Sequence, residues 1–449
     1  MLLITIVEEL DRQLKQSEST TVLSYFFCQG TNQDLNNATA ILRGLIYLLI
    51  EQRPVLISHL RASYDHAGSN FFQDANSFIA LSKVLEGMLH DKSLTRAYLV
   101  IDALDECDVN QRQLLDLITK RAAASRVKWI ISSRNKPEIE WFLTTDNSST
   151  LGLEITGNAE QVSRAVGAYI DEKIRDLPSL QDYHDSNEIR DILHEKANGT
   201  FLWVSLVFEE LRTANSWNIR EIVQEMPPTL EDLYAQMIEQ IQKLQRKDPE
   251  LCRLVLSTIT LAYRPLHLHE LGVLSNLPKE ISANMPAIRK LVAICGSFLT
   301  IQDDFIYVIH QSAQDYLSNK AAAMLFPAGH IDVYYRMFSR SLLIMQETLK
   351  RDIYGLHNIG VSINQIKGPE PDRLISVRYS CIYWISHFCE FYYTSDYQNQ
   401  ERLGKMVYNF LRQFYLYWLE ALNLMQHIGD GVLSITRLRN IAKVSSLSI

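Results

Sequence analysis

Three acidic side chains follow an apolar run that has the character of a buried β-strand. The run at residues 98–101 ends in Asp102, and Asp105 and Glu106 come shortly after it. Open α/β sheets bind ligands outside the carboxyl ends of their strands. A carboxylate at that place can hold Mg²⁺, while a second acid orients or deprotonates the water that attacks a γ-phosphate. The spacing therefore predicts a magnesium ligand at Asp102 and water-handling acids at Asp105 and Glu106. The alternative is that these acids only cap the following helix.

A second polar cluster ends the next apolar run, residues 127–132. Ser132, Ser133 and Arg134 stand at its carboxyl end, so neighbouring strands would place them beside Asp102. An arginine there can stabilise negative charge on a transferred phosphoryl group. The alternative is an arginine that is solvated or salt-bridged at the surface.

The elements needed to position these residues alternate between strand and helix over the first 156 residues, which predicts an α/β domain with a parallel sheet. The expected strands are short and apolar, as buried strands are, and cover residues 21–28, 97–101, 127–132 and 151–155. The expected helices cover residues 1–14, 38–51, 76–90 and 110–124, with a short one opening at Pro137.

The rest of the chain is predicted to be mostly helical, in three parts. Residues 157–246 form a helical domain, with helical runs at 158–175, 187–212 and 230–243. Residues 247–325 resemble a winged helix, because helices at 249–263, 268–274 and 287–295 lead into short strands at 298–301 and 305–309. Residues 326–449 form a helical C-terminal region, of which residues 437–449 have weak periodicity. Its aromatic-rich helices favour a packed core, and the alternative is a surface for repeats or partners.

Composition excludes several classes of function. The 449 residues carry 52 acidic and 44 basic side chains, a net charge of -8, and no continuous basic block, which disfavours nucleic-acid binding. The six cysteines form no CxxC pair, so reduced thiols and a cytoplasmic location are expected. Apolar runs fall short of the roughly 20 residues that span a bilayer, so no membrane partner is expected.

Five segments carry a resemblance to a known family: LSYFFCQG, LNNATAILRGLIYLLI, YLVIDALDEC, VKWIISSR and GTFLWVSLVFEEL. They resemble the fungal NACHT-type signalling ATPases of the STAND class of P-loop NTPases. The resemblance implies a nucleotide-dependent oligomerisation switch in heterokaryon incompatibility or innate immunity. It also implies ATP or ADP with Mg²⁺ as cofactors, and the same or homologous NACHT proteins as partners.

The resemblance also implies roles for single residues. Asp102 matches the Walker B aspartate, Asp105 and Glu106 the acidic pair after it, and Arg134 the sensor arginine. His310, in VIHQSAQDYL, matches a histidine that reaches the bound diphosphate in related switches. The alternative for His310 is a histidine satisfied within the core.

One expected motif is not found in these 449 residues. The family's GxxxxGK[ST] loop cradles phosphates with backbone N–H groups and a lysine, and the single Gly-Lys pair here, Gly404-Lys405, is followed by Met406. We expect the chain to start just after that loop, so that its sheet lacks the first strand and is weakened or rearranged. We also expect very weak ATP binding. The alternatives are a non-catalytic interaction or scaffold module, and a coding sequence that begins upstream of Met1 and supplies the loop.

Overall fold

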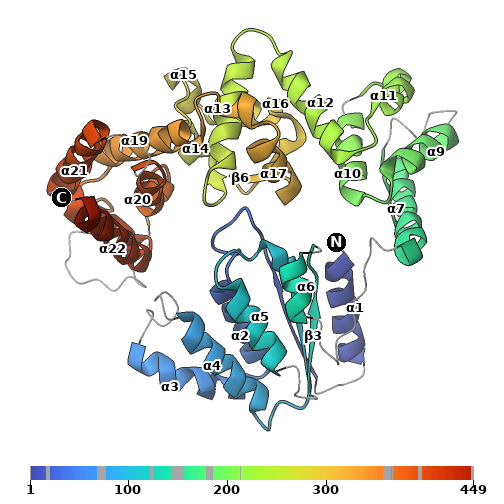
Figure 1. Ribbon diagram of the computed structural model, residues 1–449, viewed down its shortest axis with the longest axis horizontal. Helices are drawn as coiled ribbons and strands as arrows, with labels where there is room; N and C mark the ends of the chain where they lie inside the picture. Colours follow the sequence, from blue (N-terminus) through green and yellow to red (C-terminus); the bar gives the residue numbers. More distant parts are fainter. Residues whose placement is uncertain are drawn as a thin grey trace. The chain divides into compact units, whose positions relative to one another are not determined.

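The computed structural model describes most of the chain, and the described residues form two compact units (Figure 1). It describes residues 2–16, 21–67, 77–121, 126–134, 136–143, 156–177, 186–212, 214–356, 366, 368–392 and 397–445. The first unit contains residues 1–150 and 425–439, and the second contains residues 151–424 and 440–449. The chain is mostly helical, with one small parallel sheet in the first unit. The predicted finer division at residues 156, 246 and 325 stays a prediction.

The sheet of the first unit has three described strands, and these are the first three that the sequence predicts. They are β1 (Val22–Phe27), β2 (Ala97–Asp102) and β3 (Val127–Ile131), all parallel and in the order β1-β2-β3. The register pairs Phe27 with Asp102 and Ile101 with Ile131, so the strands end at one edge. The strand predicted at 151–155 lies outside the described residues.

Helices cover both faces of this sheet. Successive side chains of a strand point to opposite faces, and Leu23 and Val100 lie on the face covered by Leu3 and Val7 of α1 (Leu2–Gln16). The other face packs in a larger apolar core with residues of four helices: α2 (Ala38–Gln52), α4 (Ser77–His90), α5 (Gln111–Arg121) and α6 (Pro137–Leu143). Asp102 comes two residues after Val100 on β2, so its side chain points to the same face of the sheet, the one that α1 covers.

One helix of the first unit was not predicted. The chain continues from α2 through a short 3₁₀ turn, Pro54–Leu56, into α3 (Ile57–Ala67). Proline suits the first turn of a helix because it has no N–H to leave unpaired. Leu56 is fully buried while Val55 and Ile57 are exposed, so the apolar residues here do not form the continuous stripe by which sequence reasoning finds a helix.

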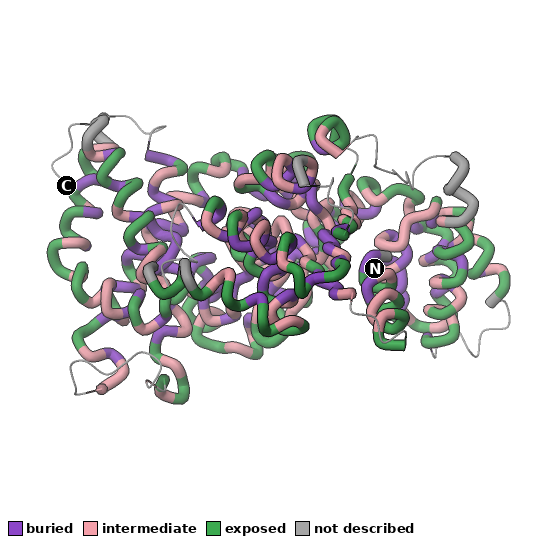
Figure 2. The backbone as a smooth tube through the Cα atoms, turned by 90° about the horizontal axis from the view of Figure 1, so that it is seen from below, coloured by how far each residue is buried: buried purple, intermediate pink, exposed green. Residues whose placement is uncertain are grey.

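The second unit begins with a run of helices in which buried and exposed positions alternate (Figure 2). The first is α7 (Thr156–Asp176), and the single run predicted at 187–212 is in fact two helices, α9 (Ser186–Ala197) and α10 (Phe201–Leu211). Asn198 and Gly199 between them have φ of 43° and 74°. These left-handed conformations end α9, since a right-handed helix cannot continue through them.

Further helices and a small antiparallel sheet follow. α11 (Ile219–Glu225) and α12 (Leu230–Gln242) lead to α13 (Asp248–Thr260), α14 (Leu268–Leu274) and α16 (Met285–Ile294). The predicted hairpin is present as β5 (Leu299–Gln302) and β6 (Phe305–Val308), and the unpredicted β4 (Leu266–His267) pairs with β6 on its other side. The assignment of this part as a winged helix stays a prediction.

The last helices bury many aromatic side chains. They are α17 (Gln311–Asn319), α19 (His330–Thr348), α20 (Arg378–Tyr392), α21 (Tyr397–Leu424) and α22 (Ile428–Ser445). Trp384 and Trp418 have no exposed surface, and the Trp418 Nε1–H donates to the Cys381 carbonyl at 2.8 Å. Most aromatic residues of α20 are therefore core, as predicted, whereas Tyr408 and Tyr415 of α21 are exposed. The weak periodicity at 437–449 failed to indicate α22.

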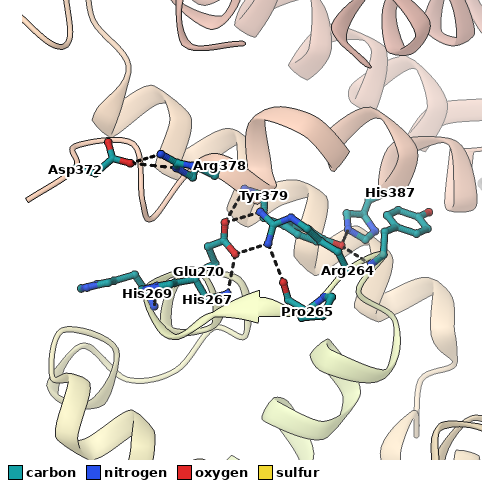
Figure 3. A network of polar contacts seen from close by, with 10 residues as sticks. Arg264, Pro265, His267, His269, Glu270, Asp372, Arg378, Tyr379 and His387 are labelled. Carbon is teal, nitrogen blue, oxygen red and sulfur yellow. Dashed lines mark hydrogen bonds and ion pairs between the residues drawn. The ribbon is translucent and has the colours of Figure 1, made fainter. Parts of the chain in front are cut away.

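A buried ion pair connects two parts of the second unit that are far apart in sequence (Figure 3). Arg264 donates to both carboxylate oxygens of Glu270, at 2.7 and 2.9 Å. Glu270 also accepts from the backbone N–H groups of His267 and Tyr379 at 2.9 Å each. Because Glu270 is 1% exposed, removal of Arg264 would leave a buried charge and cost about 3–5 kcal/mol.

Because α2 packs closely on β1, we expect a glycine-to-alanine change in α2 to lower stability, the reverse of its usual effect in a helix. A glycine-to-alanine change inside a helix usually stabilises it by about 1 kcal/mol. A Cβ on Gly44, however, would lie 2.5 Å from Cδ2 of Phe26. We expect Gly44→Ala to destabilise the first unit, because overpacking costs about 1–3 kcal/mol, as measured by the midpoint of urea unfolding.

The matched control removes the obstructing ring. In a Phe26→Ala background the same Gly44→Ala change should raise the unfolding midpoint, since space is then available. A rise in both backgrounds would show that the ring moves aside at no cost.

Candidate functional site

The side chain of Asp102 is fixed by the end of the neighbouring strand. The Ser132 hydroxyl donates a short hydrogen bond to Asp102 Oδ1 and accepts one from the backbone N–H of Ala103 at 2.9 Å. Among the described residues, Asp102 Oδ2 has no protein partner. The β2–β3 register thus brings Asp102 and Ser132 together, as predicted, and leaves one carboxylate oxygen free to bind a ligand.

Asp105 and Arg134 form an ion pair instead of acting independently. The Arg134 Nε–H donates to Asp105 Oδ2 at 2.6 Å, and the Arg134 backbone N–H donates to Oδ1 at 3.0 Å. The Asp105 side chain is 3% exposed and that of Arg134 is 55% exposed. Burial alone would raise the pKa of Asp105, but the bonds and charge of Arg134, with the charge of Lys136, hold it below its ordinary value.

This geometry changes the roles expected of Asp105 and of Arg134. With both oxygens bonded and the side chain buried, Asp105 cannot deprotonate a water while the pair is intact. The salt-bridged alternative for Arg134 describes its contact, although its exposed guanidinium still lies at the carboxyl edge of the sheet. Asp105 is therefore placed to orient Arg134 and the end of β3.

Glu106 has a different environment. Its Oε2 accepts the backbone N–H of Gly30 at 2.7 Å, from the loop after β1. Burial raises the pKa of Glu106, opposed by the Gly30 N–H, and the negative charges of Asp105 and Asp102 raise it further. A half-buried carboxylate with a raised pKa is the better proton acceptor of the two acids.

Several contributors to this edge carry no signal in the sequence. The Gly30 backbone, the Asn36 side chain and Lys136 belong to it, and Asn36 Nδ2 donates to Asp108 Oδ2 at 3.2 Å. The Lys136 ammonium donates to the Asp105 carbonyl at 2.9 Å.

Ala103 has φ of 52°, a left-handed conformation that turns the chain directly after Asp102. Asp105 and Glu106 lie in a 3₁₀ turn, Leu104–Glu106, and do not cap α5, which begins at Gln111.

His310 lies in the second unit and caps α17. Its Nδ1 accepts the backbone N–H of Ser312 at 3.1 Å, and the Ser312 hydroxyl is 2.8 Å from the same atom. Tyr234 contacts that hydroxyl at 3.0 Å. His310 is exposed, so it is not the core histidine of the alternative interpretation, and its proposed contact with a nucleotide stays a prediction.

The donor set of the first unit fits a magnesium ion. Mg²⁺ takes oxygen ligands, commonly one or two carboxylates with water and phosphate. Asp102 offers a carboxylate oxygen, and the Ser132 bond fixes its orientation. Among the described residues no cluster of three His, Cys, Asp or Glu side chains could hold a metal alone, so water and phosphate would supply the other ligands.

Comparison with known proteins identifies the relationship. The vegetative incompatibility protein HET-E-1 of Podospora anserina is 43% identical over 462 residues, which cover 98% of this chain. The chain belongs to the family of this incompatibility protein. The predicted resemblance to fungal NACHT-type incompatibility proteins is confirmed, although the chain spans only 33% of that relative's length.

Two further matches are more limited. The family model described as "Nephrocystin 3, N-terminal" matches residues 1–134, the part of this incompatibility-family chain that holds the acidic edge. A solved structure, a Walker-type ATPase of Pyrococcus abyssi, is 12% identical and covers 70% of this chain and 94% of its own. Its TM-score is 0.27. This likeness is too low to describe the fold, which the strands and helices given above define.

The Asp105–Arg134 pair predicts a pH-dependent loss of stability. Since the folded-state pKa of Asp105 is lowered, its contribution is present above the ordinary aspartate pKa and is lost as pH falls through the folded value. We expect Arg134→Ala to cost about 1–3 kcal/mol at pH 7 and progressively less below pH ~4. Urea unfolding between pH 3 and 7 measures this. A pH-independent cost would contradict the ion pair as its source.

The contribution of Glu106 to stability should depend on pH in the opposite direction. Because its folded-state pKa is raised, stability is lost as pH rises from the unfolded to the folded pKa. Glu106→Gln keeps an oxygen that can accept the Gly30 N–H and removes the buried charge. We expect the variant to gain about 0.5–2 kcal/mol at pH 7 and to match the unmodified protein near pH 3, in the same urea series. A destabilised variant at pH 7 would show that the charge itself holds the Gly30 loop.

Proposed function

We propose that the carboxyl edge of the first unit is the magnesium- and water-handling part of a nucleotide-hydrolysing switch. The observation that carries the proposal is Asp102 at the end of β2, held by Ser132 with Oδ2 available, beside a buried pair and a second acid. The membership in an incompatibility-protein family supports it. The activity of the whole relative is only a proposal for this chain, because the chain spans 33% of that relative's length.

Each residue of the edge has a separate role in this proposal. Asp102 holds a magnesium ion directly or through water, and that ion would neutralise phosphate charge when bound. Glu106, with its raised pKa, accepts a proton from the attacking water. Asp105 holds the exposed guanidinium of Arg134 at the edge, where it stabilises charge on the transferred group.

The regulatory output is proposed at the level of the family. ATP or ADP with Mg²⁺ would set the conformation, and His310 of the second unit would report the nucleotide from the cap of α17. The partners would be other copies of this chain or homologous NACHT proteins, assembled in incompatibility or innate immunity. The STAND assignment and the winged helix belong to the same proposal. No helix among the described residues has the length and apolar content to cross a membrane.

The decisive experiment supplies the phosphate-binding half of the site. A polypeptide of these 449 residues should bind fluorescent Mg·ATP only in the millimolar range, about -4 kcal/mol, because no GxxxxGK[ST] loop lies within it. Fusion of a strand and such a loop in front of α1 should bring the dissociation constant to about micromolar. Titration with and without Mg²⁺ measures both.

Single substitutions in the fused protein then test the acidic edge. Asp102→Ala should weaken magnesium-dependent binding by about tenfold or more, as expected for loss of a charged ligand. Glu51→Ala is the matched control, because Glu51 is exposed near the end of α2, at the opposite edge of the sheet. If Asp102→Ala leaves the magnesium dependence intact, the edge is no metal site, and the non-catalytic interaction module becomes the better account.

A further inference from the structure

Tyr234, Ser312 and His310 form a chain of hydrogen bonds within the second unit. The Tyr234 hydroxyl lies 3.0 Å from the Ser312 hydroxyl, which lies 2.8 Å from His310 Nδ1. The backbone N–H of Ser312 donates to the same nitrogen at 3.1 Å. Tyr234 belongs to α12, whereas the other two residues lie at the start of α17. The chain therefore connects a side chain of one helix to the N-cap residue of another.

The backbone fixes the direction of each hydrogen bond in this chain. An amide N–H can only donate, so His310 Nδ1 accepts and carries no proton of its own. The Ser312 hydroxyl beside that nitrogen must then donate to it, which uses the single proton of the serine. The serine oxygen is left to accept from the Tyr234 hydroxyl. In neutral His310 the ring proton is therefore on Nε2.

Tyr234 is a firmly held donor at the inner end of the chain. It is 2% exposed, and its ring stacks on Phe298 and packs against Tyr316, with centroid distances of 5.6 and 5.4 Å. Burial raises the pKa of Tyr234, so its hydroxyl stays protonated at neutral pH. Among the described residues, the hydrogen-bond partner of this hydroxyl is Ser312.

Capping of α17 does not by itself require this chain. The cap needs an acceptor for the Ser312 backbone N–H, and His310 Nδ1 supplies it. The Ser312 hydroxyl adds a second donor to the same nitrogen, and the Tyr234 hydroxyl polarises that donor. The two hydroxyl groups therefore act on the imidazole of His310, on its orientation and on the place of its proton.

We propose that Tyr234 and Ser312 are positioning residues that hold His310 with Nε2 as a hydrogen-bond donor for a phosphate oxygen, a role that rests on the proposed function of His310 as the nucleotide contact. Ionised phosphate oxygens accept hydrogen bonds. A ring nitrogen with a lone pair would repel them, whereas an Nε2–H matches them. The same chain makes the contact sensitive to α12, because withdrawal of the Tyr234 hydroxyl weakens the hold on the ring.

Nitrogen-15 NMR of the histidine rings tests the place of the proton without any nucleotide. The 449-residue chain is labelled with nitrogen-15 histidine, and the His310 signals are identified by their loss in His310→Gln. At a pH at which the ring is neutral, we expect an unprotonated Nδ1 and a protonated Nε2. A protonated Nδ1, or an equal mixture of the two tautomers, would overturn the inference.

Substitutions along the chain test the two positioning residues. Ser312→Ala removes one of two donors and should move the Nδ1 resonance of His310 toward that of a nitrogen that accepts no hydrogen bond. Tyr234→Phe keeps the buried ring and should cause a smaller shift in the same direction, since linked hydrogen bonds strengthen one another by about 10–30%. Ser312→Thr keeps the hydroxyl and should restore the original resonance.

Tyr316→Phe is the matched control for Tyr234→Phe. Tyr316 packs against Tyr234 but takes no part in the chain, so its loss of a hydroxyl should leave the Nδ1 resonance unchanged. An equal shift in both tyrosine variants, or no shift in Ser312→Ala, would contradict the positioning role. If Tyr234→Phe does not fold, the two substitutions of Ser312 still decide the test.

Binding of Mg·ADP separates this role from the proposed function. In the protein fused to a strand and a GxxxxGK[ST] loop, Ser312→Ala should weaken binding about three- to tenfold, as expected for one impaired hydrogen bond, and Ser312→Thr should not. Equal binding by all variants would overturn the phosphate role while the proposed function stands. No nucleotide binding by the fused protein would overturn the proposed function and the phosphate role together, and the NMR result would still decide whether Tyr234 and Ser312 position the ring.

Discussion

The burial of the Asp105 carboxylate is the constraint on which the acidic edge depends. A buried charge must be paired, and the partner is Arg134, which follows the neighbouring strand. This pairing fixes the end of β3 against the end of β2, and with it the position of Ser132 on Asp102. One ion pair therefore positions both the free oxygen of Asp102 and the exposed guanidinium of Arg134. Asp105 contributes to the edge by orienting its neighbours.

The two acids after Asp102 differ because their partners differ. Asp105 accepts from a guanidinium, which lowers its pKa, whereas Glu106 accepts only a backbone N–H and its burial raises its pKa. Environments that push the pKa values of neighbouring acids apart assign them different roles. The Asp105–Arg134 pair is stable, and Glu106 has the environment that the proposed proton transfer requires.

A buried network in the second unit also depends on paired charges. Arg264 and Glu270 are both largely buried and bonded to each other, and they connect the segment before α14 to α20. His387 beside them stays neutral at ordinary pH, because burial lowers its pKa to about 3. This network therefore has a structural explanation within the protein.

The sequence by itself determined the three strands of the sheet, the positions of Asp102, Asp105, Glu106 and Arg134 at strand ends, and the family. Those features follow from local apolar runs, from the chain order of polar residues and from direct similarity. Only the tertiary structure decided that Arg134 pairs with Asp105, that the Gly30 backbone binds Glu106 and that the Tyr379 backbone binds the buried Glu270. The physical reason is that hydrogen bonding and burial depend on which residues meet across the fold, and a periodic pattern along the chain specifies a face but not its partner.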